Sequence, residues 1–321
     1  MAHREDYSAR RPRLIPYILY RPDWWIAWLL FWLLCAICWL PVPWLRAFGR
    51  RLGWLFGRVA KSRRHIVRVN LQLCFPELSS AERERMLWAH FEAIGMGIFE
   101  TLAAGMAPDL MVSRYLDVEG LQHLDAAKAD GHGVLLLTGH FTTLELAARA
   151  LCIADRPFHA MYRPMQNRLL DYWVRRWRER RSKRESLRKD DLRRLLRVLR
   201  NGESIWYGPD QTLDTPNSAF VPFFGVPALT VTATSRLAEM GRARVVPFFP
   251  ARLNGRYHIT FYPALENFPS GDDVADARRV NALLEDAIRR CPEQYFWVHR
   301  KFKYQPPGMP DVYAKTDSVD G

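Results

Sequence analysis

A histidine and an acidic residue five positions apart, His140 and Glu145, form the pattern in this sequence that best suits acid–base chemistry. Histidine ordinarily titrates near neutral pH, and a carboxylate on one ring nitrogen makes the other nitrogen a better base. We therefore expect His140 to take the proton of an attacking hydroxyl, with Glu145 as its partner. The spacing alone is a weak signal, because a histidine beside a helix start more often caps the helix or packs in a core.

The residues around His140 predict a strand, a short turn and a helix. Residues 133–138 form an apolar run typical of a fully buried strand, and a glycine and His140 follow it. A helix capped by Thr142 or Thr143 would place Glu145 in its first turn, where its carboxylate can bend back towards His140. Open α/β sheets bind ligands beyond the carboxyl ends of their strands, so this is a suitable position for a catalytic base.

An activated acyl donor such as a thioester suits this pair, because a hydroxyl attacks it only if its proton is removed as the bond forms. The sequence has no G-x-S-x-G elbow, and we expect no enzyme nucleophile. It also lacks a Walker loop, a GxGxxG pattern and zinc-ligand spacing, so neither a metal nor a cofactor is expected.

Two further polar residues follow predicted strands, Arg163 after residues 158–162 and Asp210 after residues 204–207. A guanidinium suits an acceptor phosphate or the charge that develops on a thioester oxygen. Asp210 lies in a Gly-Pro-Asp turn, where it could orient Arg163 or His140 or only cap the turn. We expect both residues in the substrate-binding site, with a surface salt bridge as the alternative for Arg163.

Helices and strands alternate along the chain, which predicts an α/β fold with a mixed, largely parallel sheet covered by helices. The expected helices are residues 45–73, 79–105, 142–151, 167–200, 232–240 and 276–290, and the expected strands are residues 133–138, 158–162, 204–207, 245–249, 258–262 and 295–299. Ser79 and Glu82 form a capping box at the start of the second helix. We divide the chain into a basic N-terminal segment (1–23), a membrane anchor (24–45), a catalytic domain (46–305) and a polar tail (306–321).

Residues 24–45 contain no charged residue and are about as long as the roughly 20 residues that cross a bilayer as a helix. Tryptophans lie towards both ends and arginines flank the run, which predicts an N-terminal membrane-anchoring helix rather than a buried core helix. Pro41 and Pro43 offer an alternative, in which the helix ends near Leu40 and a shorter segment dips into one leaflet. The denser basic stretch follows the anchor and favours a cytoplasmic catalytic domain.

The formal net charge of +13 and the pI of about 9.8 favour an anionic partner, which could be nucleic acid, an anionic membrane or an acidic carrier protein. The basic run within residues 167–200 could dock the carrier protein or lipid headgroups, and a plain solvated helix face is the alternative. The chain lacks recognisable nucleic-acid modules. Its five scattered cysteines indicate no disulfide framework.

With these features, the chain resembles the lipid A biosynthesis acyltransferases, the late lauroyl/myristoyl transferases of Gram-negative bacteria. The family mark is a histidine, four residues and an acidic residue, which His140 and Glu145 meet. Residues 138–146, TGHFTTLEL, match the lauroyl-type members closely. Further matches are NLQLCFPE at 70–77, GMG at 95–97, MYRP at 161–164, WYGPDQ at 206–211, FVPFF at 220–224 and PEQYFWVHR at 292–300.

The resemblance implies a fold similar to glycerolipid acyltransferases and a location at the cytoplasmic face of the inner membrane. It implies an acyl carrier protein thioester as donor and a phosphorylated, Kdo-bearing lipid A precursor as acceptor. The attacked hydroxyl would lie on an acyl chain already attached to that precursor.

Two other functions remain as alternatives. The first is an acyltransferase with a glycerophospholipid acceptor, although the Glu-Gly-Thr-type phosphate-binding turn of that family is missing from this sequence. The second is a membrane-tethered binder of anionic ligands without catalysis, which would explain the charge but not the strand, histidine and helix in succession.

Overall fold

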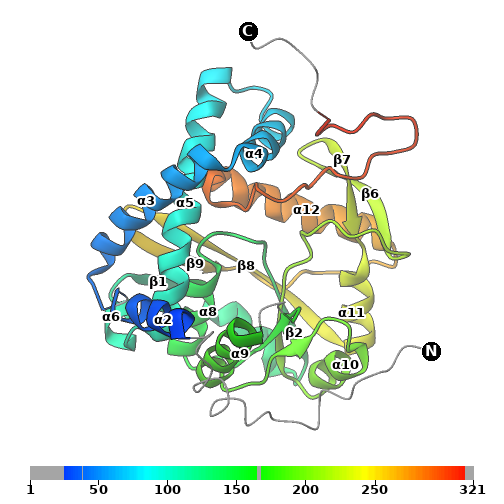
Figure 1. Cartoon of the computed structure of the whole chain (residues 1–321). Coiled ribbons are helices and arrows are strands. Elements are labelled where there is room, and N and C mark those ends of the chain that lie inside the picture. The colour runs from blue at the N-terminus through cyan, green and yellow to red at the C-terminus, as the bar shows by residue number, and fades with distance from the viewer. Residues whose placement is uncertain (1–24, 38, 165–167, 315–321) are drawn as a thin grey trace, which may run out of the picture.

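The computed structural model describes residues 25–37, 39–164 and 168–314, and a seven-stranded sheet runs through this part of the chain (Figure 1). The sheet has the order β1-β9-β8-β2-β5-β3-β4, and its neighbouring strands are parallel except for β8 and β9. Its strands are β1 (Leu116–Glu119), β2 (Gly133–Leu137), β3 (His159–Tyr162), β4 (Leu187–Arg188), β5 (Ser204–Tyr207), β8 (Ala243–Leu253) and β9 (Arg256–Phe261). The predicted α/β fold with a mixed, largely parallel sheet is confirmed.

The helices cover both faces of the sheet (Figure 1). They are α2 (Trp25–Ile37), α3 (Val42–Val59), α4 (Lys61–Cys74), α5 (Ser80–Met106), α6 (Asp109–Ser113), α7 (Leu121–Ala129), α8 (Leu144–Ile153), α9 (Arg168–Ser182), α10 (Leu192–Arg200), α11 (Ala233–Gly241) and α12 (Asp273–Arg290).

Strand β2 is buried on both faces, which explains why its sequence is apolar throughout. Leu135 and Leu137 belong to one buried core and Val134 and Leu136 to the other, because successive side chains of a strand point to opposite faces.

Three sequence predictions of secondary structure are wrong. The helix predicted at 45–73 is divided at Ala60 into α3 and α4. The helix predicted at 167–200 ends at Ser182, because Lys183 takes a left-handed φ of 56°, and β4 precedes α10. Residues 295–299 form successive turns after a short 3₁₀ helix (Pro292–Gln294), with one isolated bridge from Tyr295 to Phe141. A hairpin of β6 (Ser218–Phe223) and β7 (Val226–Val231) was not predicted.

The apolar N-terminal run belongs to two helices. Helix α2 ends at Ile37, and Pro41 precedes α3, so the break lies where the prolines indicated. Among the residues that the structure describes, no helix combines the length and apolar character needed to cross a membrane. The predicted basic segment 1–23, Trp24 and the end of the tail (315–321) lie outside the described residues. Within the described part of that tail, Tyr313 is buried and donates a hydrogen bond to Asn70 at 2.5 Å.

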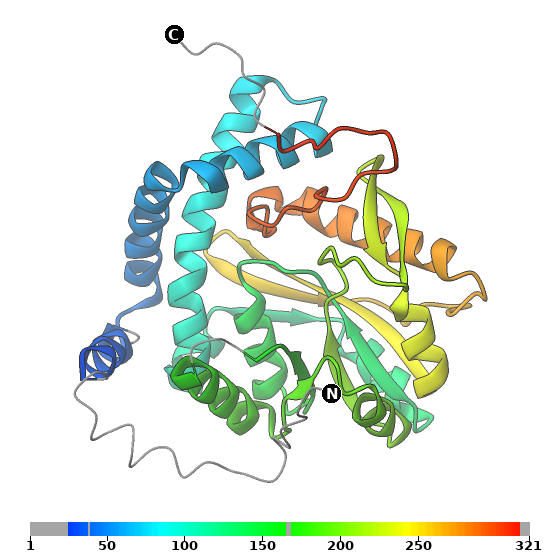
Figure 2. The same cartoon turned by 45° about the vertical axis from the view of Figure 1, so that its right-hand side comes forward.

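Helices α3 and α5 are in direct backbone contact and lie side by side at the outer edge of the molecule (Figure 2). Gly53 faces Phe91 so closely that an added Cβ would stand 2.0 Å from the Phe91 carbonyl oxygen. A Cβ on Gly95 would stand 2.4 Å from the Gly53 nitrogen. Glycine is therefore required at this crossing, because any side chain would force the helices apart.

Helix α5 also reaches the loop that carries His140. It begins with the predicted capping box, in which the Ser79 hydroxyl accepts from the Glu82 amide and the Glu82 carboxylate accepts from the Ser79 amide. Two turns before its end, Gly97 lies against the Thr142 carbonyl, which would be 2.7 Å from an added Cβ. The 27-residue helix thus links the N-terminal helices to the loop after β2.

Candidate active site

His140 and Asp210 form a close polar pair at the carboxyl edge of the sheet. The Nδ1 atom of His140 lies 2.6 Å from Oδ1 of Asp210, and the backbone amide of His140 donates to Oδ2 at 2.8 Å. Both carboxylate oxygens therefore hold the same histidine, one through the ring and one through the main chain. Because Nδ1 is bound to a carboxylate, it carries the proton in the neutral ring, and Nε2 is left as the basic nitrogen.

The register of two parallel strands explains why these residues meet. Strands β2 and β5 are neighbours, and Leu137 is paired with Tyr207. His140 and Asp210 each follow their paired residue by three positions, so they leave the sheet at the same level. The ring of His140 lies close against Gly208, since a Cβ there would stand only 3.2 Å from Cε1 of His140.

The histidine of the pair is partly exposed to solvent, and the carboxylate is buried. The side chain of His140 is 35% exposed and that of Asp210 only 2%. The charge of Asp210 raises the pKa of His140 above its ordinary value of 6.5, although burial of the ring acts in the opposite direction. Burial acts to raise the pKa of Asp210, but the charge and hydrogen bonds of His140 outweigh it and lower that pKa.

The basic nitrogen of His140 faces an exposed amide. Nε2 of Gln211 lies 3.1 Å from Nε2 of His140, where an amide N–H donates to the ring lone pair. The Gln211 amide lies on the side of Nε2 from which a substrate hydroxyl would approach and donate its proton. The geometry therefore fits a general base whose outer nitrogen accepts a proton and whose inner nitrogen stays bound to a carboxylate.

Three residues beneath this pair were not recognised as site residues from the sequence. Nζ of the buried Lys301 donates to the Asp210 carbonyl at 3.0 Å and so holds the turn that carries the carboxylate. Burial raises the pKa of Tyr295, and the nearby Asp210 adds to this shift. His299 accepts from the Thr212 amide at 3.3 Å, and burial lowers its pKa. The sequence carries a signal for all three, because they lie in or next to the matched motif at 292–300.

Glu145 does not pair with His140. Its carboxylate forms an ion pair with Arg178 of α9, and the Arg178 Nε is 3.4 Å from Glu145 Oε2. The predicted partnership of Glu145 with His140 is therefore wrong in its geometry, and Asp210 takes that place. Thr143 is the N-cap residue of α8, but its hydroxyl makes no hydrogen bond with the described residues.

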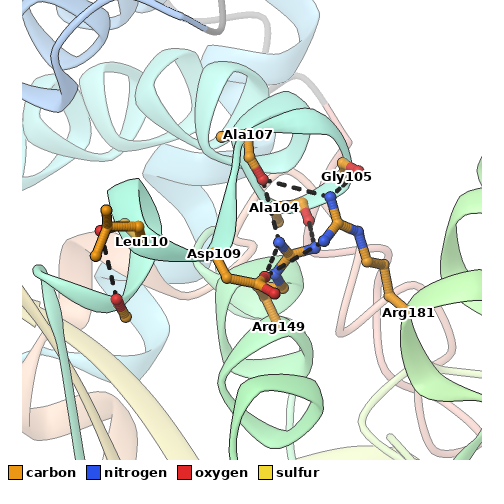
Figure 3. A network of polar contacts seen from close by, with 8 residues as sticks. Ala104, Gly105, Ala107, Asp109, Leu110, Arg149 and Arg181 are labelled. Atoms are coloured by element: carbon orange, nitrogen blue, oxygen red, sulfur yellow. Dashed lines mark hydrogen bonds and ion pairs between the residues drawn. The ribbon is translucent and has the colours of Figure 1, made fainter.

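A network of two arginines fixes the helices that carry this ion pair (Figure 3). Arg149, one turn after Glu145 in α8, donates to the carbonyls of Ala104 and Ala107 at 3.2 and 3.1 Å. Arg181, one turn after Arg178 in α9, donates to the Ala107 carbonyl at 3.3 Å, and both guanidiniums bind Asp109. Positive charge is favourable at this point, because the last carbonyls of α5 carry the negative end of the helix dipole.

We expect Glu145 and Arg178 to behave as one unit. Glu145→Gln or Arg178→Gln alone should lower stability and turnover, since each leaves a half-buried charge without its partner. The double variant should be at least as stable as the less stable of the two single variants. The coupling between the two positions should be at least about 1 kcal/mol in the free energy of unfolding. Lys183 and Asp155 form an exposed pair that serves as control and should show a much smaller coupling. Equal coupling in the two pairs would contradict this interpretation.

Arg163 lies directly after β3, which is the neighbour of β5 in the sheet. Its backbone therefore leaves the same edge of the sheet as His140 and Asp210. Its side chain is exposed, and it has no hydrogen bond or ion pair with any residue that the structure describes. Its predicted role in substrate binding stays a prediction. Within the described residues, no cluster of three or more His, Cys, Asp and Glu side chains could hold a metal ion.

Comparisons with known proteins bear on what this site does. Residues 18–304 match the model of the family described as "Bacterial lipid A biosynthesis acyltransferase". The lipid A biosynthesis lauroyltransferase of Escherichia coli K12 is 39% identical over 298 residues, which cover 92% of this chain and 97% of that protein. The palmitoleoyltransferase of the same organism is 36% identical, covering 91% of this chain and 95% of that protein. The myristoyltransferase is 31% identical and covers 92% of both chains.

Proposed function

The chain belongs to the bacterial lipid A biosynthesis acyltransferase family and is an acyltransferase, and on that premise we propose which groups it transfers and how. The donor is the thioester of an acyl carrier protein. The acceptor is a hydroxyl on an acyl chain of a Kdo-bearing lipid A precursor. The reaction takes place at the cytoplasmic face of the inner membrane, with His140 as general base.

The observation that carries the proposal is the His140–Asp210 pair. Asp210 holds Nδ1 of His140 at 2.6 Å, so the neutral ring keeps its proton there and turns Nε2 outward as a base. The buried carboxylate also stabilises the imidazolium that forms when Nε2 accepts a proton. This assignment replaces the carboxylate of Glu145 by that of Asp210 and leaves the role of His140 as the sequence predicted it.

The proposed reaction needs only one proton carrier. The acceptor O–H gives its proton to Nε2 of His140 while its oxygen forms a bond with the thioester carbonyl carbon. The C–S bond then breaks, and the departing thiolate takes the proton from the imidazolium. The ring returns to its first state, and the products are an ester and a thiol. Arg163 is proposed to bind an acceptor phosphate, since its exposed guanidinium follows a strand that ends at this site.

Charge and exposed apolar surface support the proposed partners. Basic residues of α9 offer a surface for an acidic carrier protein. Helices α2 and α3 expose large apolar side chains, including Trp25, Trp32 and Trp44, which suit a membrane surface. These observations support the proposed membrane association.

A single assay tests the acceptor. Purified protein in detergent receives an acyl carrier protein thioester together with a lipid A precursor or, in a parallel reaction, with lysophosphatidic acid, and product masses are measured. We expect one acyl chain to be added to the lipid A precursor and no product from lysophosphatidic acid. Transfer to lysophosphatidic acid alone would favour a glycerophospholipid acceptor, and no transfer to either would contradict the proposed reaction.

A further inference from the structure

An open apolar groove lies between α3, α5 and the turns at residues 296–299, outside the His140–Asp210 pair. Its volume is about 410 Å³, within the range of cavities that hold small ligands. Its walls include Leu52 and Phe56 of α3, Ile98 of α5, and Phe296. Each of these side chains remains exposed by more than 40%, so nothing in the described part of the chain covers the groove.

The depth of the groove follows from the glycine contact between the two helices. Gly53 and Gly95 lie at its floor, where the helix backbones touch. Neither position can carry a side chain, since a Cβ at Gly95 would stand 2.0 Å from the Gly49 carbonyl oxygen. The groove is therefore built into the packing of the fold rather than left by a missing side chain.

The inner end of the groove adjoins the loop that carries His140. The amide of Phe296 donates to the His140 carbonyl at 2.9 Å, so this wall is attached directly to the loop after β2. His299, at the same end, accepts from Thr212, the residue after the Gln211 that faces Nε2 of His140. The groove wall and the loop that carries the proposed base are therefore in direct main-chain contact.

The outer end continues into an exposed apolar stripe along α3. The stripe consists of Trp44, Phe48, Leu52, Leu55 and Val59, whose spacing of three or four residues places them on one side of the helix. Leu52 belongs to both the stripe and the groove wall. Arg51 and Arg58 lie next to the stripe in the helical projection, and a basic, tryptophan-bearing apolar face is typical of helices that lie in an anionic lipid surface.

We propose that the groove receives an acyl chain of the lipid acceptor, which enters sideways from the bilayer in which the stripe of α3 is immersed. The inference rests on the proposed function, because it requires an acceptor whose reacting hydroxyl is on an acyl chain. Such a chain must leave the bilayer for its hydroxyl to reach His140, and a groove open to the lipid surface keeps it in apolar surroundings on the way. A donor chain delivered by a water-soluble carrier would not need an opening towards lipid.

Ile98→Trp tests the groove, because it adds bulk to a wall position that is already 47% exposed and so leaves the core intact. Val274→Trp is the matched control, a β-branched residue of α12 that is 39% exposed and does not line the groove. We expect Ile98→Trp to raise the KM for the lipid A precursor at least about tenfold, since contacts with several methylene groups are lost. The KM for the acyl carrier protein thioester should stay within about twofold of that of the control. A rise in the donor KM alone, or no change in either, would overturn the inference.

A binding measurement separates this inference from the proposed reaction. The His140→Ala protein is mixed with vesicles of phosphatidylethanolamine and phosphatidylglycerol that contain a lipid A precursor with a diazirine in one acyl chain. After irradiation, mass spectrometry should find label in the peptides that contain Leu52, Ile98 or Phe296. If the label falls elsewhere while the unmodified enzyme acylates the precursor, the groove inference is overturned and the proposed function stands. Label in the groove, together with no acyl transfer by the unmodified enzyme, would support the groove and contradict the proposed function.

Discussion

A His140→Ala variant should bind both substrates nearly as well as the unmodified enzyme, while its turnover falls by at least about 100-fold. A positioned general base contributes about 10²–10⁴-fold to a rate. The change also leaves the buried Asp210 carboxylate without its ring donor, so the thermal unfolding temperature should fall, and turnover is measured where the variant is still folded. Steady-state kcat and KM values, together with a thermal melt, measure both parts of the expectation.

His132, at the opposite end of the same strand, provides a control. It precedes β2 at the amino end, whereas His140 follows it at the carboxyl end, and its Nδ1 forms a hydrogen bond with the Arg242 carbonyl at 3.1 Å. His132→Ala should therefore keep its turnover. Added imidazole should restore part of the activity of His140→Ala, because the deleted ring leaves a space beside Asp210 that imidazole can fill. Near-normal turnover of His140→Ala would rule out the proposed base.

The difference between Glu145 and Asp210 shows what the sequence could predict about this site. The sequence placed His140 after a buried strand, and the structure agrees, because an apolar run bounded by glycines leaves few alternatives. Its partner was chosen by proximity along the chain, which favoured Glu145. The actual partner follows β5 and is seventy residues away, and nothing in one sequence states which parallel strands lie side by side. Asp210 was identified as a site residue, but its contact depends on sheet order.

Other secondary-structure predictions were wrong for local reasons. Residues 295–299 are rich in aromatic residues and valine, which favour strands, yet the amides of Trp297 and His299 bond to carbonyls two or three residues earlier and form turns instead. The long basic helix after residue 167 contained no proline or glycine before 200, and it is broken by a left-handed residue, Lys183. The glycines at 49, 53 and 57 in α3 were a readable sign of close helix contact, although they could not identify α5 as the partner.

Asp210→Asn should also lower turnover by about 10²-fold or more, for a reason that follows from the two hydrogen bonds of this carboxylate. Asp210 accepts from both the amide and Nδ1 of His140. Asparagine has one acceptor oxygen and one donor group, so one of the two His140 donors would face an N–H. If the ring moves its proton to Nε2 to avoid this conflict, the nitrogen that faces the substrate can no longer accept a proton.

The pH dependence of kcat/KM distinguishes this effect from a loss of structure. His140 works as a base only when neutral, so activity should fall as the pH decreases through its pKa. The charge of Asp210 raises that pKa above 6.5, and this limb of the profile should lie correspondingly high in the unmodified enzyme. With the carboxylate replaced, the pKa falls and the limb moves to lower pH while the plateau drops. Asp214→Asn, at an exposed position four residues further along the chain, should leave both limb and plateau unchanged. A lower plateau with an unmoved limb would mean that Asp210 supports the loop but does not set the protonation of the base.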